Sequence, residues 1–139
     1  MEKQLAEIRF SGSEAWFQEI RCLLRQLLTG LGCDGSFTNE TVLAIQEAMA
    51  NVVRHAYRGN EAGEIILAVR RYGDDLVFRL TDFAPQVDQR QIETRDPDDV
   101  HPGGLGVYMI DRIMDRVEFI KPGPGEGNIL EMTRRLDGI

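Results

Sequence analysis

The spacing of apolar residues divides the chain into segments of helical and of strand type. Residues 15–28 and 38–57 carry apolar side chains at intervals of three and four, the spacing of one buried face of an α-helix. A third run of this kind, with Ile110, Ile113 and Met114, follows a glycine-rich stretch. These patterns predict three amphipathic helices.

Five shorter runs are rich in β-branched and aromatic residues or alternate between apolar and polar positions. They predict strands at residues 5–10, 64–72, 76–81, 117–120 and 129–134. The last four strands form two hairpins, because turn residues separate the members of each pair. The order β-α-α-β-β-loop-α-β-β predicts an α/β two-layer sandwich, in which a mostly antiparallel mixed sheet is covered on one face by three helices.

Short polar motifs predict where the helices begin. Ser11 and Glu14 are spaced as a capping box for the first helix, and Gly30 with Gly32 is expected to end it. For the second helix, residues 38 and 39 (Thr and Asn) are the expected caps. At 139 residues, we expect one domain spanning 1–139.

Composition and charge narrow the classes of partner. The formal net charge is −7 and the sequence pI is about 4.8, so the chain repels nucleic-acid backbones and direct nucleic-acid binding is not expected. No apolar run approaches membrane-spanning length and the start does not resemble a signal peptide, so we expect no membrane partner. Cys22 and Cys33 lack a metal-binding spacing, and two free thiols fit a cytoplasmic location.

The second predicted helix carries the first candidate chemical group. Glu47 and Asn51 are one turn apart, so both side chains can face one ligand, and His55 follows one turn later. An Asn carbonyl oxygen suits Mg²⁺, and a nearby carboxylate can take a proton from an attacking hydroxyl. So short a pattern is by itself more often the solvated face of an amphipathic helix.

Two further segments could contribute to the same site. Asp82 ends a strand, where its carboxylate can accept a hydrogen bond from an exocyclic amine such as that of adenine. The glycine turn from Gly103 to Gly106 opens a helix and leaves backbone N–H groups free to bind phosphate. Taken singly, an ordinary turn explains Asp82 better, and a loop-to-helix joint explains the glycines better.

Together these segments resemble the conserved boxes of the GHKL ATPase superfamily. Glu47-x-x-x-Asn51-x-x-x-His55-Ala-Tyr57 resembles its N box, Asp82 matches the start of its G1 box, and Gly104-Leu105-Gly106 matches its G2 box. Residues 82–88 and 103–115 are most similar to the anti-sigma factor serine-protein kinases. The resemblance covers the chain from about residue 8 to residue 136.

The resemblance implies ATP and Mg²⁺ as cofactors and assigns roles to residues. Glu47 is the implied general base and Asn51 the implied Mg²⁺ ligand, while Asp82 reads adenine. The other implied nucleotide-binding residues are Ala84, Gly103, Gly104, Leu105, Gly106 and Asn128. Residues 83–102 are the implied lid over ATP. The implied partner is a small STAS-domain antagonist protein phosphorylated on serine, with a sigma factor as a possible second partner and a homodimer as a possible assembly.

Three departures from the family pattern leave a second hypothesis open. Ala84 and Pro85 stand where the G1 box commonly has glycine and a flexible residue, Pro102 stands where some members have a basic residue, and Asn128 replaces a common threonine. The changes at Ala84 and Pro102 favour a non-catalytic, nucleotide-sensitive protein that sequesters a sigma factor or antagonist, whereas Glu47 and Asn51 favour the kinase, because binding alone needs no base beside a metal ligand. A sensor histidine kinase ATPase module is a third hypothesis, but no phosphoacceptor-type histidine lies on a preceding helix.

Overall fold

Five strands form one sheet in the computed structural model, which describes residues 2–85, 102–120 and 127–136, with only the backbone of 102–107. The strand order is β1-β2-β3-β5-β4, and every neighbouring pair is antiparallel, so the sheet is antiparallel throughout rather than mixed. The bounds are β1 Glu2–Ser11, β2 Glu64–Tyr72, β3 Asp75–Asp82, β4 Arg116–Ile120 and β5 Asn128–Arg135.

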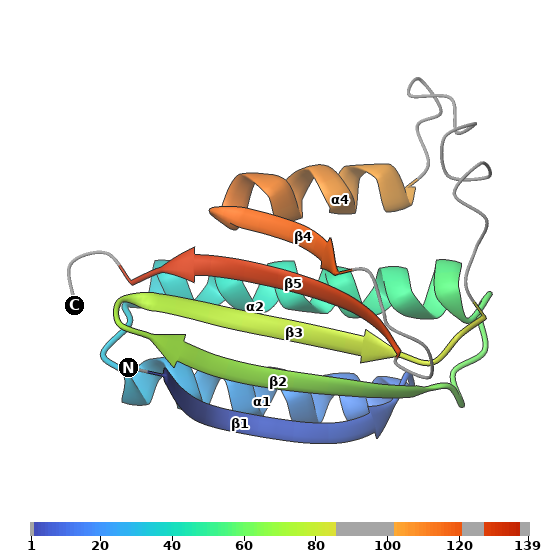
Figure 1. The fold of residues 1–139 in the computed structure, drawn as a ribbon, viewed down its shortest axis with the longest axis horizontal. Helices are drawn as coiled ribbons and strands as arrows, with labels where there is room; N and C mark the ends of the chain where they lie inside the picture. Colours follow the sequence, from blue (N-terminus) through green and yellow to red (C-terminus); the bar gives the residue numbers. More distant parts are fainter. Residues whose placement is uncertain (1, 86–101, 121–126, 137–139) are drawn as a thin grey trace.

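Three helices cover one face of this sheet, as Figure 1 shows: α1 (Glu14–Gly30), α2 (Gly35–Asn51) and α4 (Pro102–Ile113). The two-layer α/β sandwich predicted from the sequence is therefore confirmed. No helix in the described part of the chain is both long and apolar enough to cross a membrane.

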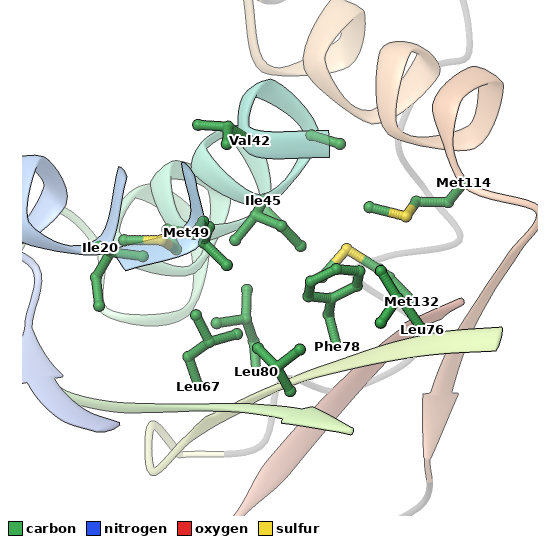
Figure 2. Close-up of a cluster of buried hydrophobic side chains, with 14 of the residues drawn as sticks. Ile20, Val42, Ile45, Met49, Leu67, Leu76, Phe78, Leu80, Met114 and Met132 are labelled. Atoms are coloured by element: carbon green, nitrogen blue, oxygen red, sulfur yellow. The ribbon is translucent and has the colours of Figure 1, made fainter. Parts of the chain in front are cut away.

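The core lies between the sheet and α1 and α2. Side chains from both helices meet alternate residues of β2, β3 and β5, as Figure 2 shows for Ile20, Ile45, Met49, Leu67, Leu76, Phe78, Leu80 and Met132. Because side chains alternate across a strand, the row Leu76, Phe78, Leu80 continues to Asp82 on the same face. This alternation therefore turns the carboxylate of Asp82 toward the helices, and Asp82 is only 7% exposed.

Both expected helix caps were wrong by a few residues. Ser11 is the last residue of β1 and pairs with Glu64, so Ser13 caps α1 instead, its hydroxyl accepting from the Trp16 N–H at 3.4 Å. For α2, Asp34 is the cap. Its carboxylate accepts from the N–H of Phe37 at 2.8 Å. Helix α2 therefore begins before the residues 38 and 39 that were expected to cap it, because Asp is as good a cap as they are. The first helix ends at Gly30, as expected.

The second predicted helix does not stay α-helical to residue 57. From Val52 to Ala56 it forms a π-helical turn, η1, in which the Tyr57 N–H bonds to the carbonyl of Val52, five residues earlier, at 3.0 Å. Glu47 and Asn51 precede this turn and keep their α-helical spacing. His55 lies within this turn, so the α-helical spacing that was expected to align it with Asn51 does not apply to it.

Two predicted segments lie outside the described residues. Most of the implied lid falls in 86–101, and most of the turn between β4 and β5 falls in 121–126. The hairpin that this turn closes is nevertheless confirmed, because Val117 pairs with Met132 and Ile120 with Ile129.

Candidate functional site

The three sequence-predicted segments converge at one end of the molecule. In Figure 1 the C-terminal end of α2, the end of β3 and the N-terminal end of α4 all lie at the right-hand side. Helices α2 and α4 pack directly against each other. The fold therefore brings the expected base, the expected adenine-reading carboxylate and the expected phosphate-binding backbone to one region.

An arginine that sequence reasoning did not single out bridges the two polar residues of α2. Arg54 Nη2 lies 3.7 Å from the Glu47 Oε2 carboxylate oxygen and donates to Asn51 Oδ1 at 3.3 Å. The Glu47 side chain is 32% exposed, so solvent and ligands can reach it. Arg54 follows Asn51 by three residues, a spacing from which the contact could have been anticipated.

The same Asn51 oxygen is the one that would ligate a metal. A carbonyl oxygen has two lone pairs, so a cation could bind beside the arginine contact, but two positive charges would then be adjacent. Metal binding would therefore favour movement of the Arg54 guanidinium toward an anion. Among the described residues no group of three or more His, Cys, Asp or Glu side chains could hold a metal ion. Asn51 fits Mg²⁺ on this point, since that ion takes few protein ligands and completes its shell with water and phosphate oxygens.

Asp82 is held by one of its two carboxylate oxygens. Oδ1 accepts from the Ala84 N–H at 3.1 Å and from Asn128 Nδ2 at 2.8 Å. The second donor of the same amide reaches the Ala84 carbonyl at 3.0 Å. The structure thus brings together Asp82, Ala84 and Asn128, which the sequence placed in one pocket.

This arrangement leaves specific atoms for a ligand. Oδ2 of Asp82 accepts no hydrogen bond within residues 2–85, 102–120 and 127–136. Both donors of the Asn128 amide are used, so only its carbonyl oxygen can meet a ligand. The Oδ2 acceptor of Asp82 suits a ligand that presents an amine, and the exocyclic amine of adenine has that character.

Gly127 is a further residue that the sequence analysis did not assign. A Cβ built on it would lie 2.6 Å from the Asp82 carbonyl oxygen and 2.7 Å from Thr81 Cγ2. Only a residue without a side chain lets the start of β5 approach the end of β3 so closely. Gly127 therefore sets the separation at which the Asn128 amide reaches Asp82.

The glycine run lies inside a helix rather than in a turn before it. Helix α4 begins at Pro102, so Gly103, Gly104, Leu105 and Gly106 belong to its first turns. Proline favours the first helical position because its φ angle is already helical and its missing N–H is not needed there. The first N–H groups of a helix have no acceptor within the helix, so those of Gly103 and Gly104 can still bind phosphate, whereas Gly106 is the fifth residue of α4, where the N–H bonds within the helix.

Tyr57 closes the region between α2 and the strand ends. Its hydroxyl oxygen accepts from the Phe83 N–H at 2.8 Å and donates to the carbonyl of Glu64 at 2.5 Å. Burial raises the pKa of Tyr57, and the nearby charges of Asp82 and Glu64 act in the same direction, so the hydroxyl stays protonated. The sequence analysis included Tyr57 in the motif but gave it no role.

Known proteins share both the sequence pattern and the fold. The family described as histidine kinase-like ATPase domain matches residues 10–134. Serine-protein kinase RsbW of Listeria innocua is 32% identical over 128 residues, which cover 81% of this chain and 78% of that protein. RsbW of Oceanobacillus iheyensis is 30% identical over 107 residues, covering 68% and 67%.

Two solved structures have the same fold. A chain of the SiaB–SiaC complex from Pseudomonas aeruginosa gives a TM-score of 0.66 at 16% identity, covering 94% of this chain and 89% of that one. The RsbU and RsbW domains of Rv1364c from Mycobacterium tuberculosis give a TM-score of 0.66 at 20% identity. The match covers 94% of this chain but only 31% of that longer chain.

The sequence matches decide the family, whereas structural likeness at such low identity shows only the fold. The family match covers most of the chain, and the relatives named RsbW confirm the resemblance to the anti-sigma factor serine-protein kinases. This protein belongs to the histidine kinase-like ATPase family.

Proposed function

We propose that this protein is an ATP-dependent serine-protein kinase that phosphorylates a STAS-type antagonist and acts as an anti-sigma factor in partner switching. The observation that carries the proposal is the convergence of Glu47 and Asn51, Asp82, and the start of α4 at one end of the sheet. The relatives' name, serine-protein kinase RsbW, supports the same reaction.

The adenine end of the site is assigned to the strand ends. Oδ2 of Asp82 accepts a hydrogen bond from the adenine amine, while Ala84 and the Asn128 carbonyl oxygen border the base. The support for this assignment is that Oδ1 is already bonded within the protein, which leaves Oδ2 toward a ligand.

The phosphate end is assigned to the helices. The backbone N–H groups of Gly103 and Gly104 bind phosphate oxygens, Leu105 and Gly106 form the helical turn that follows them, and Asn51 Oδ1 would ligate Mg²⁺. The ion would neutralise part of the phosphate charge and fix the phosphate geometry. Glu47, one turn before Asn51, takes the proton from the serine hydroxyl as the serine oxygen bonds to the terminal phosphorus, and the bond from that phosphorus to the bridging oxygen breaks, so that ADP leaves.

The partners follow from the same proposal. A STAS-type antagonist presents the serine, and a sigma factor is a second binding partner. We also propose that the protein works in the cytoplasm and can form a homodimer. An acidic chain with net charge −7 does not favour direct binding to nucleic acid.

A second candidate function is a non-catalytic protein that sequesters its partner and uses nucleotide only to set its shape. One observation favours it: the proposed base, Glu47, is already paired with Arg54. In this pairing the Arg54 guanidinium competes with a serine hydroxyl for the Glu47 carboxylate oxygen.

Glu47→Gln separates the two functions. The substitution keeps the size and hydrogen bonding of the side chain but removes the base, so phosphorylation of a STAS protein by labelled ATP should fall by about 10²–10⁴-fold. ATP affinity should stay unchanged. Glu19→Gln is the matched control, since Glu19 is an exposed glutamate on α1, and it should transfer phosphate at the wild-type rate. Wild-type transfer by Glu47→Gln would rule out the base, and ATP binding without any transfer by the wild type would favour sequestration.

A further inference from the structure

We propose that Tyr57 is a positioning residue that holds the end of β3 so that Asp82 can discriminate adenine from other bases. This inference rests on the proposed function, because it takes Asp82 as the residue that reads the base. It assigns Tyr57 a role in nucleotide selectivity, although Tyr57 itself need not touch the nucleotide.

The hydroxyl of Tyr57 joins two backbone groups that lie just past the last pair of the ladder between β2 and β3. Its bond from the Phe83 N–H, at 2.8 Å, holds the peptide group that directly follows Asp82. Its bond to the carbonyl of Glu64, at 2.5 Å, fastens the same oxygen to the first residue of β2. Neither group belongs to the ladder between these strands, whose last pair is Ile65 with Asp82.

The ring of Tyr57 is confined as closely as its hydroxyl. A Cβ on Gly63 would lie 2.5 Å from the ring, so the tyrosine packs flat against a residue without a side chain. The π-helical turn delivers the ring to this place, because its final N–H bond runs from Tyr57 to Val52. The position of the hydroxyl is therefore fixed by backbone on both sides.

Asp82 has few other restraints on its outer side. Its backbone is paired with Ile65 on one side and with Asn128 on the other, but the chain leaves the sheet directly after it. Beyond that point, among the residues that the structure describes, the hydrogen bonds that hold the chain are those of Phe83 with Tyr57 and of Ala84 with Asp82 and Asn128. Without the tyrosine hydroxyl, the Phe83 N–H loses its partner and the peptide beside Asp82 can rotate.

The consequence for the ligand is specific to the base. A carboxylate selects adenine over hypoxanthine because adenine offers an amine where hypoxanthine has a carbonyl oxygen. A hydrogen bond to a charged group corresponds to about tenfold to hundredfold in affinity, and it is lost when the acceptor is displaced. A shift of Asp82 should therefore weaken ATP binding and leave ITP binding nearly unchanged.

The test compares ATP with ITP on the wild type, Tyr57→Phe and Asp82→Asn, using dissociation constants measured by calorimetry. We expect the wild type to prefer ATP by about tenfold to hundredfold. Tyr57→Phe should reduce this preference by at least about threefold, mainly through weaker ATP binding. Partial unfolding lowers the affinity for both nucleotides by the same factor, so the ratio is insensitive to lost stability.

The outcomes separate this inference from the function on which it rests. If Asp82→Asn leaves the ATP preference of the wild type intact, the proposed adenine contact is wrong. If Asp82→Asn removes the preference but Tyr57→Phe retains it, Asp82 reads the base without help from the tyrosine. Tyr57 would then have only a structural role, and the inference would be overturned.

Discussion

Replacing Asn128 by aspartate would place two carboxylates where an amide now meets one. The two side chains have the same shape, but the Nδ2 donor that lies 2.8 Å from Asp82 Oδ1 becomes an oxygen. Asp82 is only 7% exposed, so the new pair sits partly out of water. Two carboxylates at this separation share one proton, and the pKa of the pair is raised.

The magnitude follows from two contributions. Loss of the bond to the Ala84 carbonyl costs about 1 kcal/mol at any pH. Repulsion between two unit charges about 4 Å apart is about 4 kcal/mol at an effective dielectric constant of 20. Because residue 128 is half-buried, screening by solvent reduces this to about 1–3 kcal/mol.

The sign of the pH dependence is fixed by the raised pKa. Below the unfolded-state value, about 4 for aspartate, the shared proton is present in both states and donates the bond that the amide supplied. As pH rises through the folded-state pKa of the pair, the folded protein must lose that proton, and stability falls. The deficit of Asn128→Asp should therefore be about 1 kcal/mol near pH 4 and about 2–4 kcal/mol at pH 8.

Urea unfolding of the wild type and the variant between pH 4 and pH 8 would measure this difference. Asn128→Ala is the matched control, because it loses both amide bonds without adding a charge. Its deficit should change much less with pH. If the deficit of Asn128→Asp is constant across this range, or changes no more than that of the control, the Asn128–Asp82 contact is not as described.

Two further predictions concern packing and burial. Gly127→Ala should lower the free energy of unfolding by about 1–3 kcal/mol, because its Cβ would meet the Asp82 carbonyl oxygen at 2.6 Å. The control Gly30→Ala has open space around its Cβ and should not be destabilised, so equal urea midpoints for the two variants would contradict the prediction. Cys33 is buried and burial raises its thiol pKa, so a thiol reagent at pH 8 should modify the exposed Cys22 first. Mass spectrometry of the singly labelled protein would identify the site, and faster labelling of Cys33 would refute the burial.

The periodicity of apolar residues was sufficient to predict the elements and their layers. Helices and strands need only local spacing for recognition, and both hairpins are short-range contacts. The caps were less predictable, because Asp34-Gly35 forms as good a helix start as the residues that follow it. The π-helical turn was not predictable at all, since Val52 and Val53 continue the apolar stripe of α2 whether or not the turn changes.

The candidate site likewise has one part that local sequence spacing predicts and one part that it does not. Glu47 and Asn51 could be predicted as neighbours from the helix alone, because one turn separates them. The contact between Asp82 and Asn128 joins residues 46 positions apart, and it depends on which strand lies beside β3. Local patterns do not determine that order, so this half of the site was accessible only through the family resemblance.

Because of the π-helical turn, the geometry of the site depends on the number of residues between Asn51 and Tyr57. Such a turn holds one residue more than an α-helical turn of the same reach. If Val52–Ala56 were α-helical with no residue removed, Glu47 and Asn51 would stay in place, but everything beyond would be turned by about 100° around the helix axis, the rotation of one residue. The ring of Tyr57 would then point away from Gly63 and Phe83. The number of residues between Asn51 and Tyr57 is thus as much a determinant of this site as their chemical identity.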